Sequence, residues 1–176
     1  MPPLELYTAD TPNGKKISIA LEEMGLDYVV KPVDIGGNVD QFTPEFKAIS
    51  PNSKIPAIVD YDTADGLPQT VFESGAILLY LAHKVGKFMP SAPRDIISCH
   101  EWLFWQVGGF GPMAGQVHHF LAVQAKDGMA DKVAYSVARY QKEVHRLYAV
   151  MDEHMSAGGR EYFAGEQYSI ADMAIL

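Results

Sequence analysis

The order of elements in the first 35 residues constrains the fold more than any other feature of the chain. Leu4 and Leu6 are separated by the polar Glu5, which is the alternation of a half-buried strand. Apolar residues then recur at the spacing of one helix face over residues 14–25, and residues 28–35 (YVVKPVDI) read as a second strand. Two strands that are joined by a crossover helix run parallel, so we expect an α/β unit.

The segment that follows completes a small domain of mixed strands and helices. We expect a short helix capped by Thr43 with Pro44 in its first turn, strands over residues 57–61 and 69–72, and a helix from Ser74 to Gly86. The last two strands are close enough in sequence to form a hairpin.

The character of the chain changes after residue 86. The segment GKFMPSAPRD is rich in proline and small residues, as linkers between domains are, and no convincing strand follows it. We expect a helix over IISCHEWLFWQV that is interrupted at Gly108–Pro112. A later helix is indicated by apolar residues at steps of three and four: Val133, Val137, Tyr140, Val144, Leu147, Met151 and Met155.

These patterns predict an α/β plus all-α chain with an α/β domain over residues 1–86, a linker over 87–92 and an all-helical domain over 93–176. The motif SIAD (Ser169 to Asp172) resembles a capping box, so a last helix begins there. Because the sequence ends only a few residues later, at Leu176, we expect the helical domain to be incomplete.

Composition excludes several classes of function. With a net charge of −8 and no block of Lys or Arg, the chain is not expected to bind nucleic acid, and it has no apolar run long enough to span a bilayer. Cys99 is the only cysteine, so no internal disulfide forms, and a cytoplasmic location is expected. His100, His118 and His119 lack ligand spacing, so no metal is expected.

Three short motifs offer candidate binding groups, each with a simpler structural alternative. Thr11 and Asn13 open the first helix, where unpaired N–H groups attract anions, although the same residues would form an ordinary cap. In FESGA, Glu73 and Ser74 suit a ligand with an ammonium and a carboxylate, although Ser74 could equally be an N-cap.

The third motif is SKIPAI, in which a proline stands directly before a strand. If the bond to Pro56 is cis, the backbone groups of Ile55 point outward, where an extended peptide could pair with them. The alternative is an ordinary trans proline, which is much the commoner case for an X–Pro bond.

Taken together, TPNGKKISIALEE, SPNSKIPAIVD, FESGAILLYLA, WLFWQVGGFGPMAGQ and YSIAD resemble the glutathione transferase superfamily. The similarity covers nearly the whole chain and is greatest to the bacterial nu-class branch of glutathione-dependent disulfide-bond oxidoreductases. The resemblance implies a thioredoxin-like domain followed by a helical domain, a homodimer, and glutathione or oxidised glutathione as the bound molecule, with no metal.

The resemblance also implies roles for individual residues. Thr11 and Asn13 would face the glutathione sulfur as the catalytic residues. The remaining positions would contact the rest of the tripeptide: Gln41, Lys54, Ile55, a cis Pro56, Glu73, Ser74 and, across a dimer interface, Arg139. Tyr7, in the strand just before this turn, remains a rival ligand for the sulfur.

The absence of a cysteine from the first domain then predicts where the nucleophile comes from. A thiolate of glutathione, stabilised by the protein, would reduce a disulfide, with weak conjugation of electrophiles as a side activity. Two alternatives stay open: a conventional transferase that conjugates electrophiles, and a non-catalytic binding or regulatory protein of the same fold.

Overall fold

The computed structural model describes residues 3–37 and 40–175. Contacts between Cα atoms divide these residues into two compact units, one that ends at Met89 and one over Pro90–Ile175. The first unit contains every strand of the described chain, and the second is helical. This arrangement confirms the predicted α/β plus all-α fold class.

The first unit is built on a four-stranded mixed sheet in the order β2-β1-β3-β4. Its strands are β1 (Leu4–Thr8), β2 (Val29–Pro32), β3 (Ala57–Asp60) and β4 (Gln69–Phe72). As predicted, β1 and β2 pair in parallel, and β3 and β4 form an antiparallel pair. All four residues of β3 are buried, which makes β3 the centre of the sheet's core.

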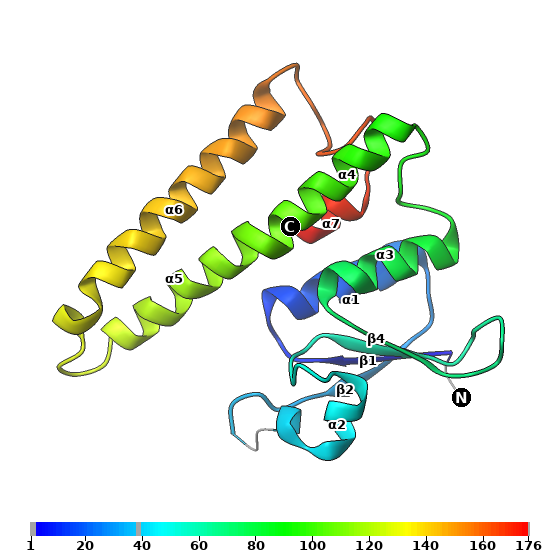
Figure 1. The fold of residues 1–176 in the computed structure, drawn as a ribbon, viewed down its shortest axis with the longest axis horizontal. Helices are drawn as coiled ribbons and strands as arrows, with labels where there is room; N and C mark the ends of the chain where they lie inside the picture. The colour runs from blue at the N-terminus through cyan, green and yellow to red at the C-terminus, as the bar shows by residue number, and fades with distance from the viewer. Residues whose placement is uncertain (1–2, 38–39, 176) are drawn as a thin grey trace. The chain divides into compact units, whose positions relative to one another are not determined.

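Helices cover both faces of this sheet. They are α1 (Pro12–Met24), the short 3-10 turn η1 (Asp40–Phe42), α2 (Pro44–Ile49) and α3 (Ser74–Val85). Figure 1 shows α1 and α3 together on one face and α2 on the other. Ile17 and Leu21 of α1, like Ile77 of α3, are fully buried, so the apolar stripes read from the sequence do face the sheet.

The second strand is shorter than the sequence suggests, because β2 ends at Pro32 and not at Ile35. Asp34 turns the chain there: its Oδ1 accepts hydrogen bonds from the backbone N–H groups of Gly36 and Gly37, each at 2.8 Å. A carboxylate that bonds its own following backbone competes with strand pairing. Periodicity alone could not reveal this competition.

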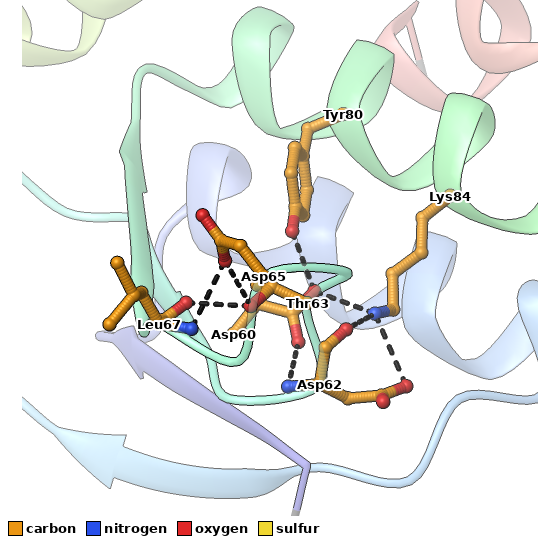
Figure 2. Close-up of polar contacts among 7 residues, drawn as sticks. All are labelled: Asp60, Asp62, Thr63, Asp65, Leu67, Tyr80 and Lys84. Carbon is orange, nitrogen blue, oxygen red and sulfur yellow. Dashed lines mark hydrogen bonds and ion pairs between the residues drawn. The ribbon is translucent and has the colours of Figure 1, made fainter.

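A buried carboxylate ties the end of β3 to α3 (Figure 2). Asp60 is fully buried, and its Oδ2 accepts a hydrogen bond from the Tyr80 hydroxyl at 2.7 Å and pairs with Lys84 Nζ at 2.9 Å. Lys84 also donates to the backbone carbonyl of Asp62. Burial together with the Asp60 carboxylate raises the pKa of the Tyr80 hydroxyl. These bonds fix the orientation of α3, whose first turn reaches the candidate site.

The second unit consists of α4 (Pro93–Trp105), a π-helical segment η2 (Gln106–Phe110), α5 (Gly111–Gln124), α6 (Ala130–Ser156) and α7 (Ile170–Ile175). The predicted interruption at Gly108–Pro112 is wrong, because α4, η2 and α5 form one continuous helical rod in Figure 1. The Gly111 N–H bonds to the carbonyl of Gln106, five residues back. This wider turn makes room for the ring of Pro112, which would clash with the preceding turn of a regular α-helix.

One hydrophobic cluster in the second unit is rich in aromatic rings. Trp102 lies 5.1 Å from Trp105 and 5.0 Å from Phe163, measured between ring centroids, and Phe110 stacks on Trp105. Phe104 is 62% exposed, so it does not belong to this cluster. The predicted stripe of α6 is confirmed, since Val133, Val137, Leu147 and Met151 are buried.

The predicted capping box at the start of α7 is also confirmed. The backbone N–H of Ser169 donates to Asp172 Oδ2 at 2.8 Å, and the backbone N–H of Ala171 donates to Ser169 Oγ. Leu176, on which the expectation of an incomplete domain rests, lies outside the described residues.

Candidate functional site

A pocket opens in the first unit where three segments that are distant in sequence meet. It is lined by Asn13, Ser50, Lys54, Ile55, Pro56, Phe72, Glu73 and Ser74. The bond between Ile55 and Pro56 is cis, as predicted. Six of the nine predicted site residues therefore lie around one pocket, and Ser50 and Phe72 are added to them.

The side of the pocket formed by α3 carries two polar side chains that capping does not use. Glu73 is the N-cap residue, at the positive φ of 71°, and its side chain makes no capping hydrogen bond. Ser74 is the first helical residue and is buried, so the alternative in which Ser74 is the N-cap is wrong. A non-glycine residue at positive φ is uncommon, and such residues cluster at ligand sites.

The turn before Pro56 is held by a serine that the sequence analysis did not select. Ser50 is fully buried; its hydroxyl donates to the Lys54 carbonyl at 2.8 Å and accepts from the Lys54 N–H at 3.4 Å. These bonds fix the backbone next to Ile55. The signal available in the sequence was a serine in SPNSKIP, which is too common in turns to be distinctive.

The mouth of α1 supplies the remaining wall. Thr11 is the N-cap, and its Oγ1 accepts from the Gly14 N–H at 3.1 Å, so the simple capping role exists. Its hydroxyl proton can still donate to another group. Asn13 lines the pocket, whereas Thr11 is not among the described residues that line it. A Cβ at Gly14 would lie 2.4 Å from the Ala9 carbonyl oxygen, so only glycine fits this close approach.

Tyr7, the alternative candidate for contact with the sulfur, hydrogen-bonds to Glu5. Its hydroxyl donates to Glu5 Oε2 at 2.9 Å, and Tyr61 donates to the same oxygen at 3.1 Å. Burial and the Glu5 carboxylate raise the pKa of Tyr7 to about 12. Although burial opposes ionisation of Glu5, its bonds to Lys31 and to both phenols lower the pKa of Glu5.

Two predicted contacts are not brought to this pocket. Gln41 lies in η1, with its Nε2 3.5 Å from the Ile35 carbonyl; its Oε1 is buried and accepts no hydrogen bond within the described residues. Arg139 is exposed on α6 in the second unit. Their roles toward glutathione stay predictions.

The environment of the chain's one cysteine disfavours its reactive thiolate form. Cys99 is fully buried in the second unit, its Sγ is 3.9 Å from Ser169 Oγ, and burial raises the pKa of the thiol. In the described ranges, no group of three or more His, Cys, Asp or Glu residues could hold a metal ion. Among the helices of residues 3–37 and 40–175, none has both the length and the hydropathy that a membrane span requires.

Comparison with known proteins decides the family. The model of the glutathione S-transferase N-terminal domain matches residues 11–84, and that of the glutathione S-transferase C-terminal domain matches residues 110–176. The disulfide-bond oxidoreductase YfcG of Escherichia coli is 50% identical over 172 residues, which cover 97% of this chain and 76% of YfcG. The chain belongs to the glutathione S-transferase family. The E. coli disulfide-bond oxidoreductase YghU is 39% identical, in a match that covers 98% of this chain and 59% of YghU.

Solved glutathione transferases have the same fold as this chain. The Pseudomonas putida enzyme, solved with one glutathione disulfide per subunit, matches with a TM-score of 0.86 and 45% identity over 97% of this chain and 71% of that one. A family member from Pseudomonas fluorescens, solved with two glutathione molecules, matches with a TM-score of 0.87 and 44% identity, covering 97% and 73% of the two chains. The family resemblance stated from the sequence is thus confirmed.

Proposed function

We propose that this chain reduces disulfides with glutathione as the electron donor. The relatives named YfcG and YghU are disulfide-bond oxidoreductases, and the Pseudomonas structures hold glutathione or its disulfide. The observation that carries the proposal is that the first unit has a pocket lined by polar groups but no cysteine that could act as the nucleophile there. Backbone and side-chain groups suited to a peptide surround the pocket, while Cys99 is buried in the other unit.

The pocket's groups suit the parts of the tripeptide. The backbone of Ile55, beside the cis bond to Pro56, pairs with the cysteinyl residue in the manner of an added strand. Glu73 accepts from the γ-glutamyl ammonium, and the Ser74 hydroxyl with the N-terminal N–H groups of α3 holds its carboxylate. Lys54, which also lines the pocket, pairs in this proposal with the glycyl carboxylate. Two further contacts are proposed from the family resemblance alone: Gln41 to the peptide, and Arg139 across a dimer interface to the glutathione of the partner subunit.

The sulfur lies, in this proposal, at the mouth of α1. The positive end of the helix and hydrogen bonds from Asn13 and Thr11 stabilise a thiolate more than a thiol. In favourable geometry the stabilisation amounts to about 2 kcal/mol, enough to lower the thiol pKa by about 1.5. Near neutral pH, the thiol of bound glutathione is then ionised to a much greater extent than the thiol of free glutathione.

The reaction is a pair of thiol–disulfide exchanges. The bound thiolate attacks one sulfur of the substrate disulfide, which forms a mixed disulfide and releases the other half as a thiolate. A second glutathione thiolate attacks the glutathione sulfur of that mixed disulfide and releases the second half. Each released thiolate takes up the proton that one glutathione lost. Two glutathiones are oxidised to glutathione disulfide, and one substrate disulfide is reduced to two thiols.

The experiment is an initial-rate assay of hydroxyethyl disulfide reduction by glutathione, with and without the protein. The proposal expects a protein-dependent rate that saturates with glutathione. Conjugation of glutathione to an aryl halide is measured in parallel. Conjugation that greatly exceeds disulfide reduction would favour a conventional transferase, and binding to immobilised glutathione without either reaction would favour a binding protein.

Three finer points belong to the same proposal. The nu-class assignment rests on the motifs quoted above, and the homodimer is what the resemblance implies. A cytoplasmic location is proposed because the reaction consumes reduced glutathione and the chain has a single cysteine. The mass of the particle in solution, from light scattering, tests the homodimer.

A further inference from the structure

A buried cation contacts one of the residues that line the pocket. Lys16, on α1, is only 4% exposed, which is rare for a lysine. Its Nζ donates to Asn13 Oδ1 over 2.9 Å, across one turn of the helix. Burial lowers the pKa of Lys16 to about 8, so the fold keeps an ammonium where water solvates it poorly.

The contact with Lys16 engages the oxygen end of the Asn13 amide and leaves the NH2 end to donate to another group. An ammonium group has only donors, so it accepts no hydrogen bond from an amide NH2 group and must face the amide oxygen. With Oδ1 held by Lys16, the NH2 group of Asn13 is directed to the other side of the side chain. Asn13 lines the pocket, and in the proposed function the NH2 group is the end of its amide that donates to the ligand sulfur.

We propose that Lys16 is a positioning residue that holds the Asn13 amide with its NH2 group presented to the glutathione sulfur. The inference rests on the proposed function and extends it by one residue. Without Lys16, the two orientations of the amide become similar in energy, and in one of them the amide oxygen faces the thiolate. An oxygen lone pair repels a thiolate, so the mixture of orientations stabilises the ionised sulfur less well.

The neighbouring lysine provides a matched control. Lys15 is on the same helix, its side chain is 67% exposed, and it pairs with Asp10 at 3.0 Å. Lys15→Met therefore removes the same charge from the same helix without touching Asn13. Lys16→Met removes the buried ammonium and keeps an unbranched chain of similar length, so it preserves most of the packing around α1.

The test measures two quantities on the full chain: the pKa of bound glutathione, from the ultraviolet absorbance of its thiolate, and kcat and KM for disulfide reduction. Lys16→Met is expected to raise the thiol pKa and to lower kcat about tenfold, with the KM for glutathione changed less than about threefold. Lys16→Arg should restore most of the loss, because a guanidinium also only donates. Lys15→Met should behave as the native protein.

A double-mutant cycle with Asn13→Ala separates positioning from a general electrostatic effect. If Lys16 acts through Asn13, Lys16→Met has little further effect in the Asn13→Ala background. Full additivity of the two losses, or native behaviour of Lys16→Met, would overturn the inference. If the native protein reduces no disulfide, the proposed function fails, and the thiol pKa of bound glutathione still decides the role of Lys16. Should Lys16→Met not fold, Lys16→Gln, which keeps a donor without the charge, is compared with Lys16→Arg in its place.

Discussion

The phenol of Tyr7 donates its hydrogen bond to Glu5 Oε2, 2.9 Å away, and not to a group in the pocket. Tyrosine and serine serve as sulfur ligands in many transferases, so the direction of this hydroxyl matters for the mechanism. We expect Tyr7→Phe to reduce disulfides at a rate within about twofold of the native rate, as a change away from the reacting atoms does. The assay is kcat for hydroxyethyl disulfide with saturating glutathione. A loss of a hundredfold would instead put Tyr7 at the sulfur.

The same bond predicts how stability depends on pH. The folded protein holds the Tyr7 proton up to about pH 12, whereas the unfolded chain releases it near pH 10. Below pH 10 the bond stabilises the fold, by on the order of 1 kcal/mol. Above that pH the unfolded chain binds fewer protons, so the contribution is lost as the pH rises through 12. Denaturant unfolding of the native protein and of Tyr7→Phe should therefore differ at pH 8 and converge at high pH; a constant difference would contradict the linkage.

Glu73 is expected to act on binding and not on stability. Its side chain makes no capping bond, and it is proposed to accept from the ligand ammonium. Glu73→Gln should therefore raise the KM for glutathione about tenfold, the equivalent of about 1.4 kcal/mol. Glu45→Gln, an exposed glutamate in the first turn of α2, is the control for charge and should leave KM as it is. An unchanged KM in Glu73→Gln would remove this residue from the site.

Gly14 is expected to be irreplaceable for a steric reason. A Cβ there would lie 2.4 Å from both the Ala9 carbonyl oxygen and Thr8 Oγ1, and the carbonyl belongs to the backbone and cannot move aside cheaply. We expect Gly14→Ala to lower the free energy of unfolding by about 2 kcal/mol, in the range of overpacked sites. In Gly115→Ala, within α5, the new Cβ meets nothing within 4 Å, so this control should gain up to about 1 kcal/mol. Equal stability of the two variants would show that the turn relaxes around the methyl group.

The order of elements in the first unit was predictable because its signals are local. Alternation, helical spacing and the pair Thr43–Pro44 each depend on neighbours in the sequence, and the structure confirms those elements. The end of β2 was missed because Asp34 bonds its own backbone. The interruption at Gly108–Pro112 was wrong because a π-helical turn can absorb a proline, and that choice depends on packing within the helical unit.

The candidate site was predictable only in part from residue types. Glu73 and Ser74 were predicted to lie at one site, and they do line the same pocket. Which of them is the N-cap of α3 depends on the positive φ of Glu73, which its residue type does not indicate. Lys16 and Ser50 were missed because a lysine is normally exposed and a serine is common in turns. Their burial follows from tertiary packing, so a single sequence gives little sign of it.

The central claim is that the reacting sulfur comes from glutathione and not from the protein, and Cys99→Ala tests it most directly. The measurement is the initial rate of glutathione-dependent reduction of hydroxyethyl disulfide by native protein and variant, with circular dichroism to confirm that both are folded. Because Cys99 is fully buried and its thiol pKa is raised, the rates should agree within about twofold. Loss of the activity in a folded variant that still binds glutathione would contradict the account.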